Sequence, residues 1–203
     1  MKTLPPFFVA ALAAALISPA TAVVVTTGVS NTSTPVTPAN PFFANVGQVN
    51  GASAIYLGNG WVMTADHVAG SLPASVTFGG TPYATQAGSW QQLLNPTGFG
   101  LTTYADIVLF RLSSNPSGLS PVTVSAGVAT VGDQIMMIGN GRQQATTPTT
   151  WNVVTGPGPS DDLWTEGGSP TTNSGFKTTA TQAVSWGENV VTGGPFAANT
   201  GTY

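Results

Sequence analysis

The sequence of 203 residues contains no cysteine and a single histidine. Disulfides, thiolate metal ligands and a thiol nucleophile are therefore excluded, and so is a metal cage built from several histidines. Charge is also scarce, with four Lys plus Arg against seven Asp plus Glu and a net charge of −3. Nucleic acids and anionic membranes bind clustered basic residues, so neither is an expected partner. We likewise expect no metal and no cofactor.

A long hydrophobic run is missing everywhere except at the start. Lys2 gives a positive beginning, residues 4–17 are apolar and rich in alanine, and Ala20-Thr21-Ala22 is a small-x-small cleavage site. This pattern predicts a secretory signal peptide over residues 1–22, whose apolar run is too short for a comfortable membrane span. We therefore expect a protein that is secreted, periplasmic or at the cell surface, with no membrane span after cleavage.

The rest of the chain also lacks any apolar stripe of helical period over ten residues. Instead, short apolar runs alternate with clusters of Gly, Pro, Asn and Ser, which is typical of an all-β barrel or sandwich. The dipeptide Asn59-Gly60 predicts a two-residue hairpin that brings residues 61–63 antiparallel to residues 54–57. Further strands are predicted at residues 75–78, 83–87, 107–112, 122–124, 135–138, 151–155, 178–186 and 190–191.

Composition also suggests how the chain is divided. Residues 23–44 are rich in Thr, Ser, Pro and Val and predict an extended leader. A turn-rich stretch at residues 113–121 marks a boundary between a first β-unit at residues 45–120 and a second at residues 121–203. A cleft between two such units is a common place for an active site.

The histidine, His67, lies in Thr64-Ala65-Asp66-His67-Val68, directly after an apolar run. Asp106 opens another predicted strand 39 residues later. Histidine titrates near neutrality, and a buried carboxylate can hold its tautomer and steady the imidazolium. Both residues lie in the predicted first unit, and we expect their side chains to meet at the groove between the two β-units, as two thirds of a hydrolytic triad. Read singly, His67 could be structural and Asp106 could cap a turn.

Three segments carry a family resemblance. Residues 58–68, with their glycine-turned strand and Thr-Ala-Asp-His, closely resemble the trypsin/chymotrypsin-like serine peptidases, and bacterial members without cysteine look closest. Residues 105–112 resemble the Asp-Ile-x-Leu segment that delivers the triad acid, and residues 131–142 resemble the first strand of the second barrel. The resemblance implies a trypsin-like double antiparallel β-barrel, with the first barrel present and the second incomplete.

The same resemblance implies roles for the two residues. His67 would act as general base and later as general acid, with Asp106 as its orienting carboxylate, in a secreted endopeptidase that acts on polypeptides. The third member is missing, because no Gly-Asp-Ser-Gly occurs and no serine follows Ser185. The favoured interpretation is a fragment that ends before the nucleophile, since residues 183–191 resemble a strand that precedes this serine in bacterial relatives.

The missing nucleophile has two alternative interpretations. Ser169 could be the nucleophile, because Ser185-Trp186-Gly187 also resembles a strand found after it, although Gly168 and Pro170 depart from the family pattern. Ser174 fits less well. Alternatively, the chain is a pseudo-peptidase that has lost the serine and serves as a secreted binding or adhesion β-protein.

Overall fold

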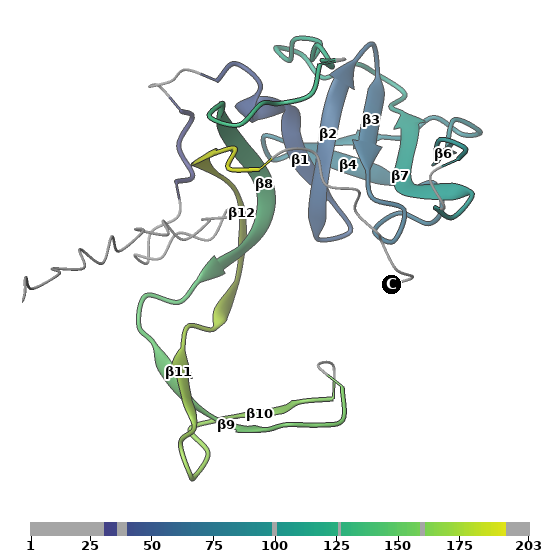
Figure 1. Ribbon diagram of the computed structural model, residues 1–203. Helices are drawn as coiled ribbons and strands as arrows, with labels where there is room; N and C mark the ends of the chain where they lie inside the picture. Colours follow the sequence, from purple (N-terminus) through teal and green to yellow (C-terminus); the bar gives the residue numbers. More distant parts are fainter. Residues whose placement is uncertain (1–30, 36–39, 99–100, 126, 159–160, 194–203) are drawn as a thin grey trace, which may run out of the picture.

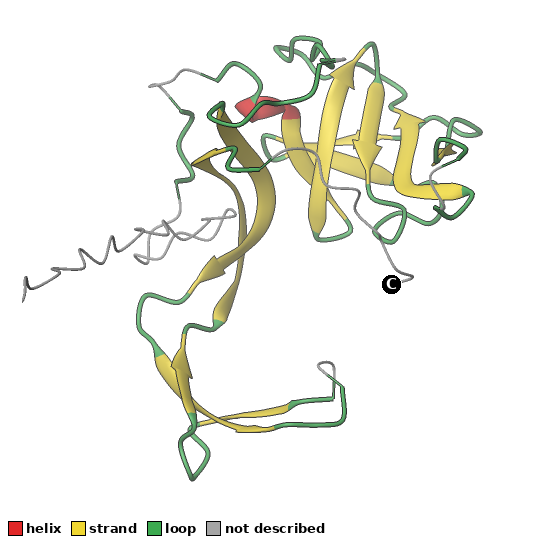
Figure 2. Ribbon diagram, viewed as in Figure 1, coloured by secondary structure: helices red, strands yellow, loops and turns green. Residues whose placement is uncertain are grey.

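The computed structural model describes residues 31–35, 40–98, 101–125, 127–158 and 161–193 (Figure 1). The predicted signal peptide and much of the predicted leader lie outside these residues. In the part that is described, the regular structure consists of β-strands and one 3-10 turn, η1 (Phe43–Asn45), as Figure 2 shows. The expected all-β class is therefore confirmed. No helix among the described residues is both long and apolar enough to cross a membrane.

The first part of the chain forms a seven-stranded antiparallel sheet in the order β5-β4-β1-β2-β3-β7-β6. Its strands are β1 (Val46–Val49), β2 (Ala52–Gly58), β3 (Trp61–Thr64), β4 (Ser75–Phe78), β5 (Thr81–Ala84), β6 (Gln91–Leu94) and β7 (Tyr104–Arg111).

Two of the tight turns of this sheet are made by Asn-Gly dipeptides. Asn59 and Gly60 both have positive φ, at 51° and 82°, and connect β2 to β3. This confirms the predicted hairpin and its antiparallel pairing. Asn50 and Gly51 have nearly the same conformation, with φ of 47° and 83°, and connect β1 to β2. Both turns use the dipeptide best able to take positive φ at two successive positions.

The sheet curls back toward itself. An isolated bridge joins Thr85, just after β5, to Leu112, just after β7. Beside it, the Gln86 N–H donates to the Arg111 carbonyl at 2.8 Å. Alternate residues of the strands point inward, as the period of two requires. They form one core, which contains Val49, Ala54, Tyr56, Val62, Val76, Phe78, Phe110 and Leu112.

The chain after β7 extends away from this core. β8 (Gln134–Gln144) and β12 (Thr178–Val190) form a long, open two-stranded ribbon. Between them, residues 145–158 and 161–177 form what we call the arm, a three-stranded sheet in the order β10-β9-β11. Its strands are β9 (Thr149–Val154), β10 (Leu163–Glu166) and β11 (Asn173–Gly175). Figure 1 shows the arm at the far end of the ribbon from the seven-stranded sheet.

Side chains connect the ribbon to the rest of the molecule. The Gln48 amide donates to the Gln182 side-chain oxygen at 2.6 Å, which links β1 to β12. At the other edge of β12, Trp186 pairs with Asn31, and its indole N–H donates to the Ser33 carbonyl at 2.8 Å. The N-terminal described segment therefore lies along β12.

Several predicted strands differ from those observed. Residues 122–124 form no strand, because the Val122 N–H donates to the Leu57 carbonyl in a contact that no ladder extends. The two strands predicted at residues 178–186 and 190–191 are replaced by one, β12 (Thr178–Val190), which ends before Val191. β6, β10 and β11 were not predicted. The division into units at residues 45–120 and 121–203 stays a prediction.

Candidate active site

A single helical turn after β3 positions His67. The N–H groups of Val68 and Ala69 both donate to the Ala65 carbonyl at 3.2 Å, which closes the turn around the histidine. Two side chains from elsewhere in the sheet hold it. The Asn50 amide donates to the Val68 carbonyl at 2.9 Å, and the Trp90 indole donates to the Ala69 carbonyl at 2.8 Å. The backbone that carries the imidazole is therefore fixed on both sides.

Asp106 reaches the same place from β7. This strand pairs with β3, and the register sets Val108 opposite Thr64, the last residue of β3. Asp106 lies two residues before Val108, so it comes beside the turn that follows Thr64. Two neighbouring strands of one sheet thus bring together residues that are 39 positions apart in the sequence.

The two side chains make a double contact. Asp106 Oδ2 lies 2.6 Å from His67 Nδ1, and Asp106 Oδ1 accepts the backbone N–H of His67 at 2.9 Å. A carboxylate only accepts, so this contact assigns the proton to Nδ1 and leaves Nε2 with its lone pair. The backbone N–H of His67 is the main reason that the pKa of Asp106 lies below its usual value, and the imidazole contributes further. This is the arrangement that a general base needs.

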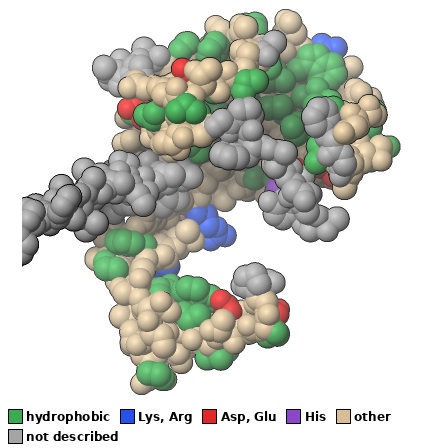
Figure 3. Space-filling view, in the orientation of Figure 1, with side chains coloured by type: hydrophobic (Ala, Val, Ile, Leu, Met, Phe, Trp, Pro, Cys, Tyr) green, Lys and Arg blue, Asp and Glu red, His purple; other side chains and the backbone are tan. Residues whose placement is uncertain are grey.

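The expected burial of the Asp106 carboxylate was wrong. The side chain of Asp106 is 52% exposed and that of His67 is 72% exposed. His67, just after β3, and Asp106, within β7, both lie in residues 45–120, the range predicted as the first unit. Asp106 precedes the buried stretch of β7, which begins at Val108. The backbone N–H of His67 and solvent stabilise its charge. In Figure 3 the histidine is visible at the surface of the molecule.

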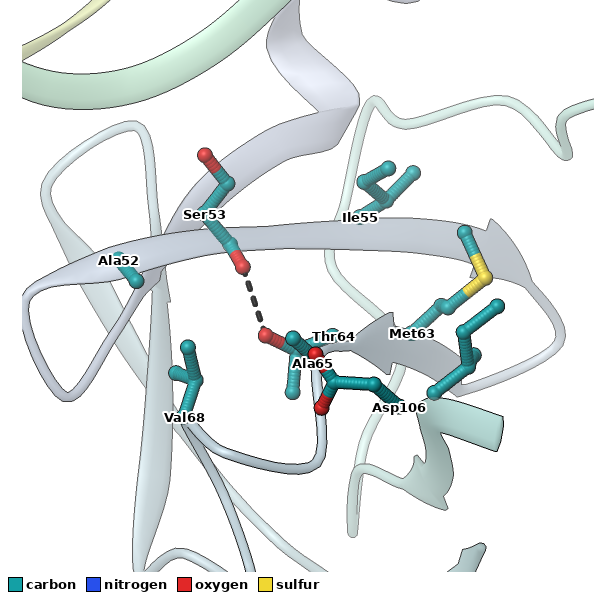
Figure 4. Close-up of a pocket in the computed structure, with 9 residues that line it drawn as sticks. Ala52, Ser53, Ile55, Met63, Thr64, Ala65, Val68 and Asp106 are labelled. Atoms are coloured by element: carbon teal, nitrogen blue, oxygen red, sulfur yellow. Dashed lines mark hydrogen bonds between the residues drawn. The ribbon is translucent and has the colours of Figure 1, made fainter. Parts of the chain in front are cut away.

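An open hollow of about 340 Å³ lies beside the pair. Its wall is mostly apolar, and Figure 4 shows the Asp106 carboxylate next to Thr64 and Ala65 at its edge. The full lining is Ala52, Ser53, Ile55, Met63, Thr64, Ala65, Val68, Asp106 and Ile107.

Ser53 is the only serine in this lining, and its hydroxyl is already engaged. It accepts the Asn140 N–H at 2.8 Å and donates to the Asn140 carbonyl at 3.3 Å, which joins β2 to β8. Figure 4 shows the hydroxyl pointing away from Asp106. Ser53 therefore has a structural role and is not placed to attack a substrate.

The structure does not bring the two serine candidates to His67. Ser169 lies between β10 and β11 and Ser174 lies within β11, so both are on the arm. Ser185 is buried in β12, opposite Gly139 of β8. Within the described ranges, no hydrogen bond is formed to Nε2 of His67. The same ranges contain no group of three or more His, Cys, Asp or Glu that could hold a metal ion.

Asn50 and Trp90 are site residues that were not predicted from the sequence. For Asn50 a signal existed, because Asn50-Gly51 is the same dipeptide as Asn59-Gly60 and marks a hairpin in the same way. Nothing local in the sequence indicates that the Trp90 indole donates to the turn around the histidine.

One comparison with known proteins found a match. A sequence model of the family described as Trypsin matches residues 28–203, a range that includes both His67 and Asp106. Searches among curated proteins and among solved structures found no match.

Proposed function

The chain belongs to the trypsin family, and on that premise we propose that it is a secreted serine endopeptidase in which His67 is the general base and Asp106 orients it. The double contact between the two residues is the observation that carries the proposal. Asp106 holds both the backbone N–H and the Nδ1 of His67, so it sets the orientation and the tautomer of the ring together. A structural cap of the turn would need only the backbone contact.

The proposed reaction follows from this tautomer. Nε2 of His67 takes the proton from a serine hydroxyl while the serine oxygen attacks a peptide carbonyl carbon. The imidazolium, steadied by Asp106, then gives the proton to the departing amine as the peptide C–N bond breaks. Water attacks the resulting acyl-enzyme by the same route, with His67 again accepting and returning the proton. Polypeptides are accordingly the proposed substrates.

We propose that the nucleophile lies in chain that follows Tyr203. The serines of the described residues support this, because none bonds to Nε2 of His67 and Ser53 is held by Asn140. The hollow beside Asp106 also offers small residues, Ala52 and Ala65, against which another backbone segment can pack closely. Such a segment would bring with it the backbone N–H groups that stabilise the oxyanion.

Export is proposed from the sequence alone. Residues 1–22 have the charge, apolar run and cleavage pattern of a signal peptide. N-terminal sequencing of the protein recovered outside the cytoplasm should begin at Val23. A mature chain that still begins at Met1 would contradict this part of the proposal.

The catalytic proposal is tested with two forms of the protein. The 203-residue chain should not react with a fluorophosphonate probe, whereas a chain extended by the residues encoded after Tyr203 should be labelled at one serine. His67→Ala and Asp106→Asn in the extended chain should abolish or strongly slow labelling. Asp66→Asn is the matched control, because this neighbouring carboxylate does not contact the imidazole, and its labelling should be unchanged.

Each remaining outcome has a definite meaning. Labelling of the 203-residue chain at Ser169 would show that the nucleophile lies on the arm. An extended chain that binds polypeptides but is never labelled would show a binding protein on a peptidase scaffold, and would overturn the catalytic proposal.

A further inference from the structure

The arm exposes apolar side chains that no other described element covers. Leu163 and Trp164 of β10 are 63% and 55% exposed, and Val154 of β9 is 56% exposed. Trp164 packs only edge-on against Trp151, with ring centroids 6.1 Å apart. A sheet normally buries its apolar face against another layer, because exposing apolar surface to water is unfavourable. This sheet leaves large side chains open on both faces.

β10 also has an open edge. It pairs with β9 on one side, and the strand order β10-β9-β11 gives it no partner on the other among the described residues. In an antiparallel ladder, half of the backbone N–H and C=O groups of such a strand point away from the sheet. Edge strands are usually protected by short length, charged side chains, Pro or a bulge. β10 is short, but its one charge, on Glu166, is paired with Lys177, and it contains no Lys, Pro or bulge. The edge can therefore accept a further strand.

The charges on the arm favour a particular kind of residue in the added strand. The arm contains three carboxylates, on Asp161, Asp162 and Glu166, and a single base, Lys177. Glu166 is paired with Lys177 at 2.9 Å, and Asp162 accepts the Gly156 N–H at 3.0 Å. Asp161 is exposed at the beginning of β10. An extended segment on this edge thus meets apolar side chains along its length and negative charge at one end.

We propose that the arm is a docking site for the substrate, and that an extended, apolar segment of the polypeptide bearing Lys or Arg pairs with the free edge of β10. This inference rests on the proposed peptidase function and adds a recognition site to it. Main-chain hydrogen bonds supply the affinity, Leu163 and Trp164 supply contacts on the two faces, and Asp161 favours a cationic residue. In Figure 3, drawn in the orientation of Figure 1, open space separates the arm from the seven-stranded sheet.

Binding is tested without catalysis, on the full 203-residue chain. The probe is a fluorescein-labelled peptide of alternating Val and Thr flanked by Lys, and the comparison peptide has the same sequence flanked by Glu. Fluorescence anisotropy should show tighter binding of the Lys peptide, with an advantage that shrinks as salt rises. Leu163→Ala should weaken binding about five- to tenfold. Asp161→Asn should reduce the preference for Lys over Glu about threefold.

A matched control is available on the seven-stranded sheet. Leu94 is 66% exposed, close to the value for Leu163, and lies on β6 away from the arm. Leu94→Ala should leave binding unchanged. Equal binding of the two peptides, or equal effects of the two leucine substitutions, would overturn the proposal. So would a chain that sediments as a dimer and becomes monomeric in Leu163→Ala, because the edge would then belong to a second copy.

This test is separate from the test of the peptidase proposal. If the extended chain is never labelled by the fluorophosphonate but the Lys peptide binds the arm, the catalytic proposal fails and the docking site stands. If labelling occurs and the arm does not bind, only the docking site fails. In an active extended chain, Leu163→Ala should raise KM for a polypeptide substrate and leave kcat unchanged.

Discussion

Asp106→Asn separates the orienting role of the carboxylate from a structural one. The asparagine amide keeps one oxygen, so it can still accept either the backbone N–H of His67 or the ring N–H. At the other position it presents an N–H to a group that is itself a donor. The backbone N–H cannot change, so the ring is expected to respond by moving its proton from Nδ1 to Nε2. Nε2 then has no lone pair for the serine proton.

The magnitudes differ between stability and catalysis. The pair is largely exposed, with 52% of the Asp106 side chain and 72% of the His67 side chain open to solvent. Solvent screening limits the contribution of the carboxylate to folding, and removing it in Asp106→Ala should lower the free energy of unfolding by about 1 kcal/mol. In a chain that carries the nucleophile, the wrong tautomer should lower kcat by about 10⁴, the cost measured for the corresponding change in a serine-peptidase triad.

Nitrogen NMR can read the tautomer directly, because the chain has only one histidine. In ¹⁵N-histidine-labelled protein the wild type should show a protonated Nδ1 and an unprotonated Nε2, and Asp106→Asn should show the reverse. Urea unfolding of the same samples gives the stability change. The orienting role is refuted if Asp106→Asn keeps the wild-type tautomer. A loss of more than about 3 kcal/mol in the free energy of unfolding, with the tautomer unchanged, would show that the carboxylate is structural instead.

Three further outcomes are expected from urea unfolding. Gly58→Ala should lower the free energy of unfolding by about 3 kcal/mol, because φ at Gly58 is +111° and the new Cβ would lie 2.6 Å from the Cβ of Pro121. Gly79→Ala is the control: φ is +54°, no atom lies within 4 Å of the new Cβ, and the loss should be about 1 kcal/mol. Ser53→Ala should cost about 1–3 kcal/mol because it leaves a backbone N–H of β8 unpaired, and fluorophosphonate labelling of the extended chain should be unchanged. The stability difference between wild type and Asp106→Asn should be constant above the ordinary carboxyl pKa and vanish as the pH falls through the lowered pKa of the folded protein. A difference that grew on acidification would contradict the assigned charge.

Strands with strong local signals were predictable from the sequence. Residues 75–78 were predicted as a strand and form β4, because an alternating apolar pattern there is followed directly by Gly79-Gly80. β10 was missed because all four of its residues are exposed, so the sequence carries no alternation of buried and open positions. The length of β12 was also missed, because Gly187 reads as an interruption whereas its pairing with Met137 continues the ladder.

The partners in the site were predictable, but their surroundings were not. The motifs around His67 and Asp106 indicated that the two side chains meet, and the structure places them in contact. Local sequence specifies which strand carries each residue and therefore which neighbours come together. The exposure of the two side chains depends on which other segments pack over them, and those segments are distant in the sequence. The expectation of a buried carboxylate failed for that reason.

In the functions proposed above, the pairing of β3 with β7 places chemistry and recognition in separate parts of the molecule. One local strand pair brings His67 and Asp106 together, and within the described residues neither side chain is hydrogen-bonded to the ribbon or the arm. Substitutions on the arm would accordingly change which polypeptides bind, while the contact between His67 and Asp106 would be unchanged. Evolution could thus change the substrate preference of the proposed peptidase without changing the residues that transfer the proton.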